Sequence, residues 1–225
     1  MVDTLLLVST WIIPVLFAIT LHEAAHGYAA NAFGDPTAKM AGRLSLNPIR
    51  HIDPFGTVIL PGLLLLAGPF LIGWAKPVPV DPRNLRNPHR NMIWVALAGP
   101  ATNVALAVFT ILALHLVVTM PDTFSRAWLI KTASNMINFN VMLAVFNMLP
   151  VPPLDGGRVL VGILPVPLAR RVAALEHKGM LILVAVLVLI PLVGHQLDQD
   201  WSIMGDVIGV PTQWLTKMLL ILFGP

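Results

Sequence analysis

Long uncharged stretches constrain the fold of this chain more than any other feature of its sequence. Only 11% of the 225 residues are charged and 56% are hydrophobic, which is far from the balance of a soluble globular domain. About 20 apolar residues suffice to cross a bilayer core. The chain is therefore expected to be an all-α polytopic membrane protein, with spanning helices in the stretches 4–21, 91–121, 132–154, 179–197 and 207–225.

A sixth apolar stretch, 54–75, is not expected to span the membrane. Pro61-Gly62 and Gly68-Pro69 interrupt it, as in a re-entrant or β-hairpin-like segment that packs against protein. Basic residues flank it on both sides, and the positive-inside rule places both flanks in the cytoplasm. The sequence thus predicts about five transmembrane helices, with the N-terminus outside, in a single domain that covers residues 1–225.

Composition also limits the chemistry and the partners of the chain. The sequence has no cysteine, so His, Asp or Glu must hold any transition metal. The formal net charge is only +3, and the basic residues are scattered over several loops. A nucleic acid is therefore not an expected partner, whereas the lipid bilayer is.

The segment His22-Glu23-Ala24-Ala25-His26 ends the first predicted helix. Residues four apart on a helix share a face, so one ion can bridge His22 and His26. Glu23 lies about 100 degrees around the helix from His22, where it can approach water without coordinating the metal. This is the division of roles in the HExxH motif of metalloproteases, in which two imidazoles hold zinc and the carboxylate is a general base.

A catalytic zinc takes a third protein ligand and keeps one open position. Position 32, where a metzincin has its next His, is Ala32. Asp155 is the favoured ligand, because it follows an uncharged run, and the surrounding prolines and glycines can turn a carboxylate inward at membrane depth. Glu176, in the basic stretch 170–178, is the alternative.

The two motifs together carry a specific resemblance. HEAAH at 22–26 and NMLPVPPLDGG at 147–157 resemble the site-2 protease family of intramembrane zinc metalloproteases. The likeness continues through GRLSLNPIRHIDPFGT, GWAKPVPVDPRNLRNP and ALAGPATN, and it is strongest to compact prokaryotic members without a PDZ or CBS domain. It implies zinc on His22, His26 and Asp155, water activation by Glu23, and Asn147 as a donor to the scissile carbonyl or its oxyanion.

Three further features have more than one interpretation. Asn147 can instead cap backbone groups near Pro150, and His51 with Asp53 is interpreted as part of a loop rather than as a second metal pair. The stretch 76–81, Lys-Pro-Val-Pro-Val-Asp, can add a strand to an unwound substrate or serve as a rigid connector. Gly99 and Asn103 are expected to permit close helix packing and an interhelical hydrogen bond.

These observations favour an intramembrane zinc metalloendopeptidase that cuts transmembrane or membrane-associated proteins, and the resemblance implies a part in regulated intramembrane proteolysis. It is expected in a prokaryotic cell membrane, with its active site toward the cytoplasm. The rival hypothesis is a metal-binding membrane transporter or a catalytically inactive binding protein with the same His and Asp ligands. Glu23 discriminates between them, because transport needs no general base that stays off the metal.

Overall fold

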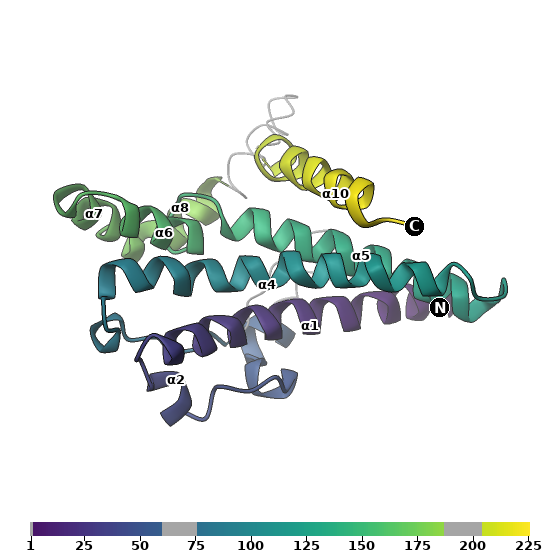
Figure 1. Cartoon of the computed structure of the whole chain (residues 1–225), viewed down its shortest axis with the longest axis horizontal. Coiled ribbons are helices and arrows are strands. Elements are labelled where there is room, and N and C mark those ends of the chain that lie inside the picture. The colour runs from purple at the N-terminus through teal and green to yellow at the C-terminus, as the bar shows by residue number, and fades with distance from the viewer. Residues whose placement is uncertain (1, 60–75, 187–203) are drawn as a thin grey trace.

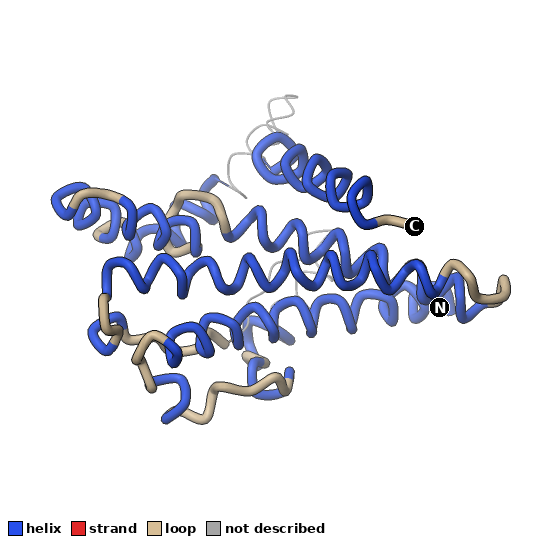
Figure 2. Tube along the Cα trace, in the orientation of Figure 1, coloured by secondary structure: helices blue, strands red, loops and turns tan. Residues whose placement is uncertain are grey.

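The computed structural model of the chain describes residues 2–59, 76–186 and 204–225. Every regular element in these ranges is a helix or a helical turn (Figures 1 and 2). Three long helices pack on one another along the length of the molecule: α1 (Val2–Ala32), α4 (Pro88–Val117) and α5 (Phe124–Asn147). The shorter helices are α2 (Thr37–Met40), α6 (Asp155–Ile163), α7 (Val166–Ala173), α8 (Glu176–Val184) and α10 (Val210–Phe223). Short turns cover Pro48–His51, Pro54–Ile59, Pro82–Asn84 and Met204–Gly209.

Four described segments are long and apolar enough to cross a membrane: Leu6–Ala32, Pro88–Val117, Phe124–Asn147 and Gly205–Phe223. Large apolar side chains on these helices stay exposed, Phe109 and Ile221 among them, as expected where a helix faces lipid rather than protein. The prediction of an all-α polytopic membrane protein is thereby confirmed. The predicted fifth span, 179–197, and the predicted re-entrant segment, 54–75, lie partly outside the described residues.

Helix α5 begins earlier than the sequence predicted. The Thr123 hydroxyl accepts the N–H of Arg126 at 3.3 Å and caps the first turn, which is a common use of threonine at a helix start. The predicted span at 132–154 thus starts too late as a helix, because Arg126 and Lys131 already lie within α5. The single charge of Lys131 interrupted the hydrophobic run without interrupting the helix.

Buried amides join the three long helices. The Asn103 side chain on α4 donates to the Ala18 carbonyl of α1 at 3.2 Å and to the Asn140 side chain of α5 at 2.8 Å. Nearer the N-terminus, the Asn135 amide donates to the backbone and the hydroxyl of Thr10. Such bonds satisfy polar groups that have no water to bind inside a bilayer. They fix the three helices in one register, on which the functional site depends.

Candidate metal centre

Helix α1 brings the two histidines of the HExxH motif together. His22 and His26 lie one turn apart and are buried, and their Nε2 atoms are 3.0 Å from each other. Their rings stand nearly perpendicular, with centroids 4.7 Å apart. The predicted convergence of the two imidazoles on one face of the helix is therefore present in the structure.

Asp155 reaches the same point from a distant part of the chain. It is the first residue of α6, and its Oδ2 lies 3.2 Å from Nε2 of His22 and 3.3 Å from Nε2 of His26. Gly156 makes this approach possible, because a Cβ atom there would come within 2.3 Å of the Met148 carbonyl oxygen. Among the described residues, these three form the one group of His, Cys, Asp or Glu side chains arranged to hold a metal ion.

The outer nitrogen of each ring is fixed by a partner on α4. Nδ1 of His26 lies 2.7 Å from the Val95 carbonyl, and Nδ1 of His22 lies 2.6 Å from Oδ1 of Asn103. Both partners are acceptors, since the Asn103 NH₂ group already donates to Ala18 and Asn140. Each Nδ1 therefore carries the proton, and each Nε2 turns a lone pair toward the other ring and Asp155.

The three groups fit a divalent metal. Two imidazole lone pairs and a carboxylate oxygen face one another within 3.3 Å, and Asp155 Oδ2 has no hydrogen-bond donor in the part of the chain that is described. Ligands at about 2.0 to 2.1 Å around a tetrahedral zinc ion lie roughly 3.3 Å apart. A cation among these atoms matches both the spacing and the unsatisfied charge.

Glu23 points elsewhere than its two histidine neighbours. Its carboxylate is half-buried, and Oε2 accepts the backbone N–H of Val78 at 2.8 Å. Glu23 is not among the three converging groups, as the prediction of a carboxylate that does not coordinate requires. The contact also places the extended stretch 76–81 directly beside Glu23.

The side chain of Asn147 makes no hydrogen bond to His22, His26 or Asp155 in the described structure. It is the last residue of α5, and its amide donates to the carbonyl of Leu143 in the preceding turn at 3.0 Å. Its role toward the substrate stays a prediction. In the present conformation the amide neither reaches the metal group nor caps the backbone near Pro150.

The other candidate residues occupy ordinary structural positions. The imidazole of His51 is buried and lies 2.7 Å from the Ser45 carbonyl, and the Asp53 carboxylate accepts the N–H of Phe55. Glu176 begins α8 and pairs with Arg158 at 3.5 Å. The alternative third ligand is therefore engaged outside the metal group.

Sequence reasoning missed the part that α4 plays around the histidines. Gly99 and Asn103 were expected to pack helices, and they do, but their packing partners are the ligand rings. A Cβ atom at Gly99 would lie 2.5 Å from Nε2 of His26 and 2.6 Å from Cε1 of His22. Val95, Gly99 and Asn103 follow one another at intervals of four, which puts them on one helix face. That spacing was the available signal.

Changing Gly99 to Ala is expected to weaken zinc binding by about 10- to 100-fold, the range for losing an outer partner of a metal ligand. The added methyl group overlaps both rings, so α4 or the imidazoles must move. Zinc content after dialysis against a graded metal buffer measures the effect. Ala101→Val is the matched control, because it enlarges a side chain at an exposed position on the same helix. Equal zinc affinity in Gly99→Ala and wild type contradicts the assigned role.

A HExxH helix with a distant aspartate, buried in a bundle of membrane-spanning helices, defines a membrane metalloprotease. The model of peptidase family M50 matches residues 10–191, which is most of the chain. The chain belongs to this family, the site-2 proteases, and is a zinc metalloprotease of the membrane.

Related proteins carry names of the same kind. YwhC of Bacillus subtilis, provisionally named a zinc metalloprotease, is 39% identical over 181 residues, which cover 79% of each chain. Rip2 of Mycolicibacterium smegmatis, named in the same way, is 31% identical over 185 residues, or 82% of this chain and 67% of its own. MJ0611 of Methanocaldococcus jannaschii is 48% identical over 67 residues, covering 29% of this chain and 31% of its own. No solved structure matches the chain.

Proposed function

We propose that this metalloprotease is an endopeptidase that hydrolyses peptide bonds of transmembrane or membrane-associated proteins in regulated intramembrane proteolysis. The proposed active unit is a single domain that covers residues 1–225. The observation that carries the proposal is the set His22, His26 and Asp155 within a membrane-spanning bundle, with Glu23 beside it but engaged elsewhere.

Each residue of the centre has a distinct part in hydrolysis. Zinc, when bound, polarises the scissile carbonyl and lowers the pKa of water to about 7. Glu23 takes a proton from the attacking water and passes it to the leaving amine, the usual work of a general acid–base carboxylate. Asn103 and the Val95 carbonyl hold the two histidine rings with Nε2 inward. The chain therefore supplies the base and the ligand geometry from residues fixed by three different helices.

Asn147 is the proposed donor to the developing oxyanion. Its amide must leave the Leu143 carbonyl, to which it now donates, and turn toward the substrate. The Asn147 amide thereby exchanges its hydrogen bond to the Leu143 carbonyl for one to the oxyanion, and the Leu143 carbonyl stays in its place in the helix. A donor of this type contributes about 10² to 10³ in rate in other hydrolases.

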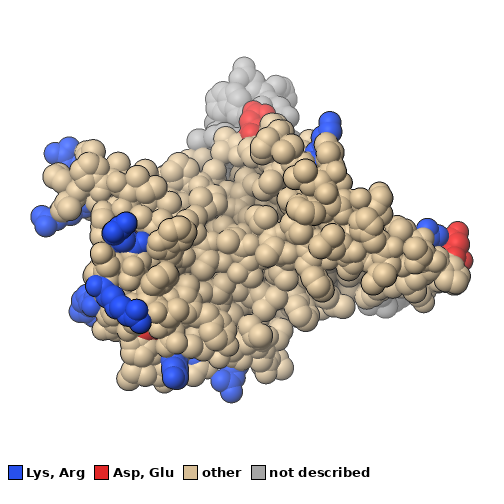
Figure 3. Space-filling view, viewed as in Figure 1, with Lys and Arg blue, Asp and Glu red and all other residues tan. Residues whose placement is uncertain are grey.

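The proposed site of cleavage is the cytoplasmic side of a prokaryotic cell membrane. Lys and Arg side chains gather over the end of the bundle that holds α2, α6 and α7 (Figure 3, in the orientation of Figure 1). The site is built from α6 and from the end of α1 that leads toward α2. Basic residues accumulate on cytoplasmic surfaces of membrane proteins, which supports this orientation.

The extended stretch 76–81 is held along the active site at two points. Glu23 accepts the N–H of Val78, and the buried Asp35 carboxylate accepts the N–H of Asp81 at 2.7 Å. Pro77 and Pro79 have no N–H to donate. The segment is therefore a rigid wall whose carbonyl groups and side chains, more than its amides, are available to a substrate peptide.

Removal of the metal distinguishes the proposed protease from the rival hypothesis of a metal transporter. Purified protein in liposomes is expected to cut a reconstituted transmembrane peptide, to lose this activity with a zinc chelator, and to regain it when zinc is restored. Mass spectrometry of the products locates the cut, and a zinc-sensitive dye inside the vesicles reports uptake. Zinc entry into the vesicles by a fully loaded protein that cuts none of the peptides overturns the proposal.

A further inference from the structure

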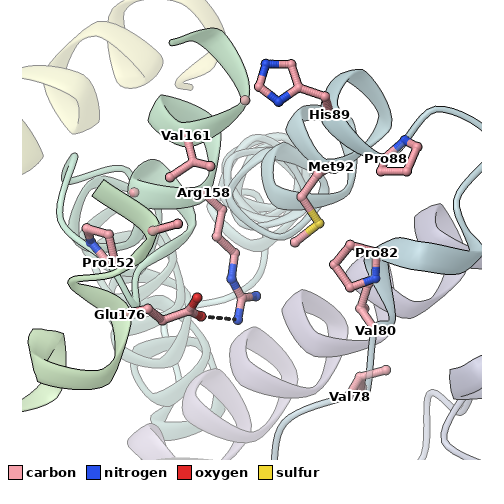
Figure 4. A pocket seen from close by; sticks show the side chains of 13 residues that line it. Val78, Val80, Pro82, Pro88, His89, Met92, Pro152, Arg158, Val161 and Glu176 are labelled. Atoms are coloured by element: carbon pink, nitrogen blue, oxygen red, sulfur yellow. Dashed lines mark hydrogen bonds and ion pairs between the residues drawn. The ribbon is translucent and has the colours of Figure 1, made fainter. Parts of the chain in front are cut away.

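A cavity of about 530 Å³ is lined by elements that also build the metal centre and takes no part in the chemistry described so far. It opens between the extended stretch 76–81, the start of α4, and the helices α6 to α8 (Figure 4). Its volume falls within the range of about 300 to 1,000 Å³ that is typical of ligand sites. The cavity is therefore large enough to hold side chains of a bound peptide.

Two walls of the cavity belong to elements that also build the active site. One wall contains Val78, whose N–H is bound by Glu23. The other is α6, which starts with the ligand Asp155 and contributes Gly157 and Val161 to the lining. The first residue of α6 belongs to the metal group and its next turns line the cavity, so one bound peptide can contact both.

The lining selects for apolar side chains. Val80, Met92 and Val161 contribute apolar side chains to the lining (Figure 4), whereas the buried Val78 side chain packs toward Gly27 of α1. The charged groups of the lining are paired, since Arg158 of α6 meets Glu176 at the start of α8 at 3.5 Å (Figure 4). With the guanidinium already matched by a carboxylate, an acidic substrate residue gains little there, while an apolar residue buries its surface against Val80, Met92 and Val161.

We infer that this cavity is a specificity pocket that binds a large apolar side chain of the substrate, one to three residues from the scissile bond. The inference rests on the proposed endopeptidase function. It assigns Val161 and Met92 to substrate selection, as residues that touch the substrate and have no part in the bond-breaking step.

Filling the pocket tests the inference. Val161→Trp occupies the cavity, whereas Ile163→Trp enlarges a side chain of the same helix that is 67% exposed and outside the lining. The substrates are transmembrane peptides that carry Ala, Leu, Phe or Asp at each of three positions on either side of the cut. Wild type and Ile163→Trp are expected to prefer Leu or Phe over Ala at one position by about tenfold or more, through a lower KM.

Val161→Trp is expected to lose this preference, so that the ratio of kcat/KM for the Leu peptide to that for the Ala peptide falls to about one. If Val161→Trp keeps the preference of the wild type, the inference is overturned. Met92→Trp, which fills the pocket from α4, gives the same test should Val161→Trp fail to fold. If both variants keep the preference, the pocket does not select the substrate.

A binding experiment separates this inference from the proposed function. In protein that carries Glu23→Gln, a benzophenone amino acid at position 161 is expected to crosslink to the Leu peptide, and the same group at position 163 is not. If position 161 crosslinks to the peptide and the wild type cuts none of the peptides, the proposed function is ruled out and the assignment of a peptide-binding pocket stands. If the wild type cuts the peptide and position 161 gives no crosslink, the assignment of the pocket is ruled out and the proposed function stands.

Discussion

Glu23→Gln is expected to reduce cleavage of a reconstituted transmembrane peptide by about 10² to 10⁴-fold, the contribution of a positioned general base, while leaving bound zinc unchanged. The glutamine oxygen can still accept the N–H of Val78, which Glu23 now binds at 2.8 Å, so the active-site wall keeps its position. The amide cannot take a proton from water at neutral pH. Initial rates of cleavage and metal content measured on the same preparation check the prediction.

Glu176→Gln is the matched control for this variant. It makes the same chemical change on a carboxylate that pairs with Arg158 outside the metal group, at the edge of the proposed substrate pocket, and its kcat is expected to stay within a few fold of the wild type. A Glu23→Gln enzyme that cuts the peptide as fast as the wild type rules out Glu23 as the base. Loss of zinc together with activity assigns Glu23 to metal binding instead.

Asp155→Ala is expected to lower zinc affinity by at least about 100-fold. Losing an outer partner of a ligand already costs about 10- to 100-fold, and this change removes one of three direct ligands. The buried Asp155 carboxylate also carries the negative charge that faces His22 and His26. Metal analysis after equilibration with a zinc buffer measures the loss, and cleavage is expected to fall in parallel.

Glu176→Ala serves as the control because Glu176 was the alternative third ligand. It is expected to bind zinc as tightly as the wild type. Full zinc retention in Asp155→Ala, combined with loss of zinc in Glu176→Ala, reverses the assignment and requires α8 to move. Asp155→Asn adds a finer comparison, since it keeps the size of the side chain and removes its charge.

Local patterns in the sequence predicted the parts of the site that lie close together in the chain. His22, Glu23 and His26 need only the geometry of one helical turn, and the structure places them as expected. Asp155 required chemical reasoning, because the chain offers few carboxylates at membrane depth. The class of fold followed from the uncharged stretches, and four of them coincide with long helices.

The remaining features depend on how distant helices meet, which no local pattern specifies. Nothing near Gly99 in the sequence says that its missing side chain makes room for two imidazole rings. Likewise, the Val95 carbonyl orients His26 through its backbone, so the identity of the residue carries no signal. The start of α5 was misplaced for a different reason, since one lysine in a helix alters hydropathy more than it alters structure.

The metal centre also links two regions that are far apart in the sequence, the first helix and the helix that follows α5. Any ligand that binds only the folded state stabilises it, by about 2.7 kcal/mol when its free concentration is 100 times its Kd. A zinc ion held by His22, His26 and Asp155 would therefore act as a reversible crosslink between α1 and α6. Removing zinc is expected to lower the free energy of unfolding of the protease as well as its activity.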